Sequence, residues 1–265
     1  LIFRRRLPLS HSIPNPLNVS EAEWQARVDL AAAFRLVDLY GWSDLLATHL
    51  SARVPDQPDC FLINPFGVMF DEMTASCLVK MDEEGNELTE SPNGVNPAGY
   101  TIHSAVHAAS PDINWAIHTH TYAGTGVATQ KDGILPITQH ALAVMAVSAY
   151  HDYEGIAFDL SERERLMADL GDNKILILRN HGLLTVGKTA GEAFMWMYRA
   201  ERACRMQLAF QQAGAELMPI PDDMQEITMQ RNRKANSAAG YRPIGVHEWP
   251  ALRRRLDRLN PGYDS

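Results

Sequence analysis

The chain has 265 residues, 46% of them hydrophobic, and a formal net charge of −8. This size and composition indicate one globular α/β domain with tails, and the acidic balance argues against nucleic acid as a partner, because phosphate binding needs clustered Lys and Arg. Three widely spaced cysteines signal neither a disulfide framework nor a cysteine zinc site, and without an apolar run of 18 residues we expect a cytoplasmic protein with no membrane contact.

The N-terminal part is predicted to be an irregular arm followed by a helix and two hairpins. Residues 1–19 contain three prolines and no helical period. The capping box Ser20-Glu21-Ala22-Glu23 starts a helix that should end at Gly41. Strands of the two hairpins are expected at residues 45–54, 60–64, 78–82 and 87–88.

The middle of the chain alternates predicted helices with short apolar strands. The helices are expected at residues 96–109, 121–129 and 161–170, and the strands at residues 113–118, 155–160, 174–179 and 183–186. A second capping box, Thr189-Ala190-Gly191-Glu192, starts the longest helix, which Gly214 should end. The pattern is not a regular β-α-β alternation, so it favours a mixed or antiparallel sheet with helices on both faces.

Residues 20–215 are therefore interpreted as one domain. Residues 216–265 are polar and contain several prolines, and we expect a tail that packs on a neighbouring subunit. The arginine clusters near both ends are interpreted as solvated termini. The chain starts at Leu1 instead of methionine, which leaves open an earlier natural start.

Histidines are the most informative residues. His118-Thr119-His120 lies at the end of the predicted strand 113–118. Strand side chains alternate, so residues two apart point to the same face, and two neutral imidazoles there can chelate one metal ion. The alternative is that these are two unrelated polar residues at a strand end.

The candidate third ligand is His181. It follows the predicted strand 174–179, and Gly182 directly after it permits a tight turn. A polar residue at the end of a buried strand is often functional, although His181 could also serve only the turn. Three histidines that leave coordination positions open would form a catalytic site instead of a closed structural one.

Two further histidines, His103 and His107, lie four residues apart on the predicted helix 96–109 and share one face. They are candidates for metal ligands or for groups that support the ligands. The alternative is a helical face that packs on the site or meets solvent, which we favour for His107.

Taken together, His118, His120 and His181 resemble the metal triad of the class II aldolase/adducin family. The similarity covers about residues 22–215 and includes the segment 63–67. It implies a three-layer α/β/α fold around a mostly antiparallel sheet, and a homo-oligomer, commonly a tetramer, with the site at a subunit boundary. It also implies one divalent metal ion, with Zn²⁺ as the first choice and Mn²⁺ or Fe²⁺ as alternatives.

Departures from the family pattern bear on the substrate. The sugar-phosphate aldolases of the family carry a Ser-Ser-Glu segment whose Glu is the acid/base and whose serines help hold phosphate. The corresponding residues here are Pro97-Ala98-Gly99, and Thr48-His49 replaces the Gly-Asn part of the phosphate loop. Gly99 cannot transfer a proton. Because the serines and a Gly-rich Walker loop are both missing, a carboxylated or aromatic substrate is expected in place of a phosphorylated sugar. The segments 96–103 and 149–153 resemble the adducin branch, whose heads are cytoskeletal binding modules in animals.

Three functions remain open. The first is a metal-dependent lyase of the aldolase or decarboxylase type that acts on a small hydroxy- or keto-acid. In such an enzyme the metal ion polarises a carbonyl or carboxylate oxygen and stabilises an enediolate as a C–C bond breaks. The proton is then expected to come from His103, Tyr100 or His49. The alternatives are a non-haem iron enzyme and an adducin-like protein-binding module without catalysis. Candidate substrate contacts, each with a structural role near a strand end as the alternative, are Asn64, Gly67, Gln139, Arg179 and Arg53.

Overall fold

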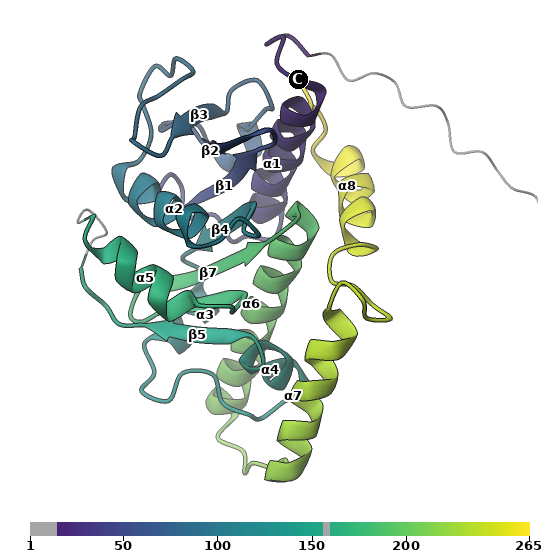
Figure 1. The fold of residues 1–265 in the computed structure, drawn as a ribbon. Helices are drawn as coiled ribbons and strands as arrows, with labels where there is room; N and C mark the ends of the chain where they lie inside the picture. Colours follow the sequence, from purple (N-terminus) through teal and green to yellow (C-terminus); the bar gives the residue numbers. More distant parts are fainter. Residues whose placement is uncertain (1–14, 156–159) are drawn as a thin grey trace, which may run out of the picture.

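The computed structural model describes residues 15–155 and 160–265 (Figure 1). Within these residues the strands form one sheet in the order β3-β2-β1-β4-β7-β6-β5. Neighbouring strands are antiparallel apart from β5 and β6, so the sheet is mostly antiparallel, as predicted. The strands are β1 (His49–Val54), β2 (Gln57–Ile63), β3 (Val79–Asp82), β4 (Trp115–Thr119), β5 (Ser148–His151), β6 (Ile175–Leu178) and β7 (Gly182–Gly187).

Helices cover both faces of this sheet (Figure 1). Alternate side chains of a strand point to opposite faces, so Ile117 of β4 joins a core cluster with Phe34 and Phe194, whereas Ala116 joins a second cluster with Ile102. The predicted three-layer α/β/α architecture is thereby confirmed. The first face carries α1 (Glu21–Leu39), α3 (Tyr122–Ala128), α4 (Gln139–Met145) and α6 (Ala190–Ala213), and the second carries α2 (Pro97–Ala109) and α5 (Glu162–Leu170).

The two long helices α1 and α6 begin and end at the predicted signals. The side chains of Ser20 and Thr189 each accept a hydrogen bond, 3.1 Å long, from the amide three residues later. Gly41 and Gly214 follow the last turns with φ of +68° and +61°, a region that glycine enters without steric cost.

A buried carboxylate on α6 fixes the segment that follows β4. Glu201 accepts hydrogen bonds from the Thr121 hydroxyl at 2.5 Å and from the Gly124 amide at 3.1 Å. Together with the ion pair to Arg205 at 3.0 Å, these bonds satisfy a charge that would be costly to bury alone. They also anchor the chain immediately after His120.

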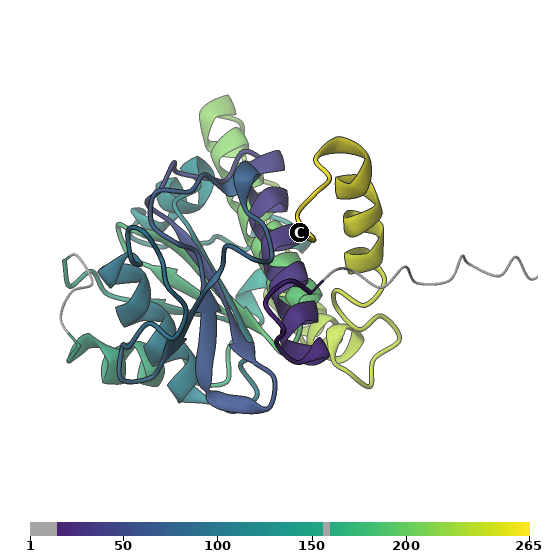
Figure 2. The same ribbon diagram turned by 90° about the horizontal axis from the view of Figure 1, so that it is seen from above.

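Two C-terminal helices that the sequence analysis did not predict pack over α1 and the α4–α6 pair (Figure 2). They are α7 (Asp222–Asn236) and α8 (Glu248–Leu259). On the α8 side, Arg253 pairs with Asp29 of α1 at 3.0 Å, and Arg35 of α1 donates to the Asn260 side chain at 2.7 Å. The segment thus packs on its own chain, and its contact with a neighbouring subunit stays a prediction.

Some local predictions differ from the structure. Residues 87–88 form no strand but a single bridge, between Met81 and Glu87. The extended segment predicted at 155–160 falls largely on residues 156–159, outside the described residues. The sequence analysis also missed α4, β5 and the 3-10 helix η1 (Phe70–Glu72). In the described ranges no helix combines the length and the apolar composition needed to cross a bilayer.

Candidate metal centre

The end of β4 presents the first two histidines of the triad. His118 pairs with His49 of β1 on one side and with Leu184 of β7 on the other, and its side chain is 1% exposed. His120 follows one residue beyond the strand. The spacing of two residues keeps both imidazoles on the same side of the chain, as predicted.

The tight turn between β6 and β7 supplies His181. Asn180 has φ of +57°, which reverses the chain directly before it. A Cβ on Gly182 would lie 2.5 Å from the Thr119 carbonyl oxygen and 3.2 Å from His120 Cδ2. Because glycine has no such atom, the turn can approach the end of β4 closely enough to place His181 beside the other two rings.

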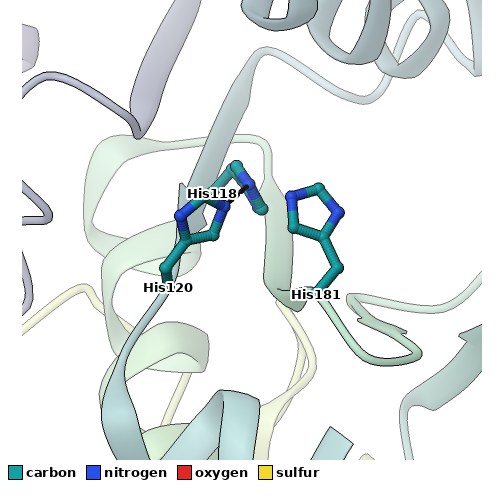
Figure 3. A group of neighbouring side chains, drawn as sticks. All are labelled: His118, His120 and His181. Carbon is teal, nitrogen blue, oxygen red and sulfur yellow. Dashed lines mark hydrogen bonds between the residues drawn. The ribbon is translucent and has the colours of Figure 1, made fainter. Parts of the chain in front are cut away.

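The three imidazoles converge (Figure 3). Their ring centroids lie 4.7 Å apart for His118 and His120, 4.7 Å for His118 and His181, and 4.9 Å for His120 and His181. One ligand nitrogen from each lies within 4.8 Å of the others. This geometry could hold one divalent metal ion.

Hydrogen bonds orient two of the rings for such a role. His118 Nδ1 donates to the Leu183 carbonyl at 3.1 Å, and His120 Nδ1 donates to the Asp44 carboxylate at 3.0 Å. Each ring therefore carries its lone pair on Nε2, and the two Nε2 atoms face one another at 3.0 Å. Two facing lone pairs repel unless a cation or a proton lies with them, so the donor set fits a metal ion.

Burial keeps the rings of His118 and His181 neutral. It lowers the pKa of His118 well below its ordinary value, and the imidazoles of His49 and His181 lower it further. Burial also lowers the pKa of His181 to about 4, with His120 and His151 adding to the effect. Neutral imidazole is the form that binds metal ions.

A second group of buried histidines lies behind the triad. The ring of His49 lies 4.9 Å from the ring of His118, centroid to centroid. His49 Nδ1 lies 2.7 Å from His103 Nε2, and His103 Nδ1 is hydrogen-bonded to Ser51 Oγ. Ser51 Oγ lies 2.7 Å from His107 Nε2. The sequence prediction that His103 and His107 share a face is confirmed, and that face meets β1.

The carbonyl of Ile113 sets the direction of this hydrogen-bond chain. It lies 3.2 Å from His107 Nδ1 and can only accept, so the proton of His107 is on Nδ1. His107 Nε2 then accepts from the Ser51 hydroxyl, which accepts from His103 Nδ1. His103 Nε2 accepts in turn from His49 Nδ1. The lone pair of His49 is therefore on Nε2, which has no hydrogen-bond partner in the described residues.

This assignment needs all three imidazoles to be neutral. Burial is the largest cause that lowers the pKa of His49 and of His103 well below the ordinary value, and nearby imidazoles lower both further. Burial also lowers the pKa of His107 to about 4. Neutral rings can then each donate once and accept once along the chain.

Gly99 of α2 leaves the room that His49 occupies. A Cβ at this position would lie 2.9 Å from His49 Cδ2 and 3.1 Å from His49 Cγ. A side chain at position 99 and the present position of His49 therefore exclude one another. The imidazole fills the space beside Gly99 where a longer residue would point.

The remaining proton-transfer candidate, Tyr100, has a partner away from the triad. Its hydroxyl donates to the Glu83 carbonyl at 2.7 Å, and its ring stacks on Phe61 with the centroids 6.4 Å apart. The structure thus ties Tyr100 to the loop after β3.

Two residues near His49 have unsatisfied buried oxygens. Asn64 directly follows β2, is 4% exposed, and has no hydrogen-bond partner for Oδ1 in the described residues. The same holds for Oγ1 of Thr48, which precedes His49. Such atoms cost free energy unless a ligand or water satisfies them, so both are candidate substrate contacts. Gly67 lies in the loop after β2 with φ of +93°.

Other predicted substrate contacts have structural partners or lie elsewhere. Arg179 borders a small cavity together with His181, but its guanidinium donates to the carbonyls of residues 130 and 131. Arg53 donates to backbone carbonyls that include the one of Ile113. Gln139 begins α4 and lines a separate cavity between α4, α6 and α7.

The sequence analysis missed Asp44 and Ser51. Asp44 lies in an aperiodic turn before β1, where nothing along the chain points to His120. Ser51 did leave a signal, because it lies two residues after His49 and so shares its face of the strand.

Comparisons with known proteins identify the family of the chain. A family profile described as "Class II Aldolase and Adducin N-terminal domain" matches residues 28–208. The crystal structure of an aldolase II superfamily protein from Pseudomonas syringae is 49% identical, has a TM-score of 0.85, and matches over 93% of this chain and 98% of that chain. L-fuculose 1-phosphate aldolase from Glaciozyma antarctica PI12 is 27% identical, with a TM-score of 0.77 and coverage of 93% and 96%.

Rattus norvegicus alpha-adducin is 41% identical over 247 residues, which are 89% of this chain but 33% of the adducin. The similarity therefore concerns one part of that longer protein. From the profile match and these identities, the chain belongs to the class II aldolase and adducin N-terminal domain family.

Proposed function

We propose that this protein is a metal-dependent carbon–carbon lyase, of the aldolase or decarboxylase type, that acts on a small hydroxy- or keto-acid. The proposal rests on three converging imidazoles, two of which donate Nδ1–H to a fixed acceptor and turn Nε2 to a common point. Three histidines with open positions match a catalytic metal site. Imidazole suits zinc and iron, so Zn²⁺ is our first choice, with Mn²⁺ and Fe²⁺ as alternatives.

In this proposal the chain's own residues bind and orient the substrate, and one of them holds the proton that is exchanged with it. A bound cation supplies a Lewis acid that polarises a carbonyl or carboxylate oxygen of the substrate. His49 offers Nε2 as an acceptor beside the ring of His118, so we assign it the proton exchanged with the substrate. His103 is fully buried and acts through His49 as a positioning residue.

The substrate class follows from the groups near His49. Asn64 and Thr48 each have a buried oxygen that a substrate hydroxyl can satisfy by donating a hydrogen bond. Pro97 and Ala98 have no hydroxyl with which to hold a phosphate. The missing hydroxyls at these two positions favour a hydroxy- or keto-acid over a sugar phosphate, whereas Asn64 and Thr48 can serve any substrate that carries a hydroxyl.

We also propose that the site lies at a subunit boundary of a homo-oligomer, with a tetramer as the expected form. Leu45 and Tyr122 flank the segment around His120 and are 68% and 97% exposed. Exposed apolar side chains beside a functional site often mark a surface that a partner covers.

A binding module without catalysis is the second candidate. The observation that favours it is the 41% identity to alpha-adducin, together with Gly99 in place of a carboxylate. The hydrogen-bond chain that orients His49 weighs against it, since binding another protein does not require a directed buried imidazole.

Elemental analysis of the purified protein tests the metal centre first. We expect about one divalent ion per chain in the wild type and in His247→Ala, an exposed-histidine control, and none in His118→Ala. The metal-loaded protein is then assayed with hydroxy- and keto-acids for release of carbon dioxide or an aldehyde. We expect activity in the wild type, and loss in His49→Gln with the metal retained. Turnover that persists in metal-free His118→Ala would rule out the lyase mechanism, and wild type that binds no metal would favour the binding module.

A further inference from the structure

A cavity of about 380 Å³ lies between α4, α6 and α7, and none of the three triad histidines borders it. Its lining includes three arginines, with no Asp or Glu among the described residues that border it. They are Arg199 and Arg202 of α6 and Arg242 after α7. This concentration of positive charge occurs in a chain whose net charge is −8.

The central cation of this cavity is Arg199. Its guanidinium lies over the Trp196 ring, 5.3 Å from the centroid, and has no hydrogen-bond or ion-pair partner in the described residues. Burial lowers the pKa of Arg199, and repulsion by Arg242 lowers it further, while Glu248 opposes the shift. A half-buried guanidinium beside a like charge is costly unless an anion joins it.

The nearby negative charge does not balance the cavity. Glu248 forms an ion pair with Arg242 at 2.8 Å. In the part of the chain that the structure describes, Arg202 contacts only Tyr198, through its hydroxyl at 3.2 Å and its ring. Three guanidinium groups against one carboxylate leave two positive charges. Guanidinium forks bind carboxylate and phosphate oxygens in pairs, so the excess matches a ligand with two negative charges.

We propose that this cavity is a second binding site, separate from the metal centre, for a small dianion such as a dicarboxylate or a phosphate ester. Arg199 and Arg242 hold its two charged ends or two oxygens of one phosphate. Asn232 of α7 and Gln139 of α4, which also line the cavity, offer amide groups to further oxygens. The site joins α4 and α7 to α6, so its ligand stabilises the packing of the C-terminal helices.

Calorimetric titration of the full chain, prepared without metal, tests the site with malonate and with inorganic phosphate at constant ionic strength. We expect at least one of the two to bind, and Arg199→Gln to weaken that binding by about tenfold or more, since a charge-assisted pair is lost. Arg231→Gln, the same change at an exposed position of α7 outside the cavity lining, should bind as the wild type does. Tighter binding of malonate would indicate a dicarboxylate site, and tighter binding of phosphate would indicate a phosphate site.

We expect His118→Ala to bind the dianion as the wild type does, which separates this site from the metal centre. The dianion site can therefore fail its test while the proposed function holds, and the proposed function can fail while the dianion site holds. Thermal unfolding gives a second readout. Without an anion, Arg199→Gln should have a Tm at or above that of the wild type, because repulsion by Arg242 is relieved. With the bound dianion, the wild type and Arg231→Gln should gain Tm and Arg199→Gln should not.

Three results would overturn the proposal. The first is the absence of binding by either dianion. The second is equal affinity in the wild type and Arg199→Gln. The third is a change of oligomeric state in Arg199→Gln during size-exclusion chromatography, because the cavity would then be filled by an acidic segment of another copy.

Discussion

The Asp44 carboxylate accepts the Nδ1 proton of His120 at 3.0 Å, so an acid on the loop between α1 and β1 orients a ring of the metal centre. Such acceptors commonly contribute roughly 10- to 100-fold to metal affinity. We expect Asp44→Ala to weaken zinc binding by about that factor, and Asp44→Asn, which keeps an acceptor oxygen, to weaken it less. Competition with a chromophoric zinc chelator measures the affinity.

The control for this experiment is Asp132→Ala, which removes an exposed carboxylate from a loop outside the triad. It should leave the zinc affinity unchanged. Equal affinities in the wild type and Asp44→Ala would mean that His120 does not depend on Asp44.

At Gly99 we predict that alanine destabilises the protein, although alanine is normally the better helix residue by roughly 0.5–1 kcal/mol. The new Cβ would lie 2.9 Å from His49 Cδ2, and overpacking of this kind costs about 1–3 kcal/mol. Urea unfolding of Gly99→Ala, His49→Ala and the double variant forms a double-mutant cycle. We expect the double variant to recover part of the loss. A coupling free energy of zero would show that the two positions do not compete for space.

The tight turn before β7 should not tolerate a side chain at Gly182. A Cβ there would lie 2.5 Å from the Thr119 carbonyl oxygen, so Gly182→Ala must move the turn, and His181 with it, away from β4. We expect a folded protein that retains less metal after dialysis. Gly126→Ala in α3 is the matched change, because its Cβ meets only the flexible end of Leu208, at 3.3 Å. Metal retention that is the same in both variants would contradict the prediction.

Stability should fall in acid because of His107. Its pKa is about 4 in the folded protein and 6.5 in the unfolded reference, so the unfolded chain binds more protons between these values. The free energy of unfolding therefore decreases as the pH falls from 6.5 toward 4. Between pH 7.5 and pH 5 this one group should contribute a loss of about 2 kcal/mol.

Urea unfolding of the wild type and of His107→Gln at both pH values measures this contribution. The other buried imidazoles have lowered pKa values too, so the variant should keep a pH dependence that is weaker by about 2 kcal/mol. An identical dependence in both proteins would mean that folding does not lower the pKa of His107.

Local signals made each of the three histidines a candidate ligand, and the resemblance to the family joined them into one triad. The spacing of His118 and His120 follows from strand alternation, and Gly182 after His181 marks the turn that brings the third ring to β4. The fold class was predictable from the mixture of hairpins and single helices, and the caps of α1 and α6 were visible at Ser20 and Thr189.

Features that depend on distant segments were not predictable. The carboxylate of Asp44 meets His120, 76 residues away, and no pattern along the chain relates the two. The helix α7 has only one buried residue, Asn236, so its sequence shows no apolar stripe and was interpreted as a tail. The roles of Gln139 and Arg179 depend on which face each element turns inward, which a single sequence does not specify.

The contacts of α1 with the C-terminal segment have a consequence for synthesis on the ribosome. Asp29 and Arg35 lie on a helix made early, yet their partners Arg253 and Asn260 follow more than two hundred positions later, with a separation of 225 residues for the second pair. Until those partners emerge, Asp29 and Arg35 lack these two contacts. The C-terminal segment therefore covers α1 only after more than two hundred further residues have been made, and a chain halted before residue 253 would leave that flank of α1 uncovered.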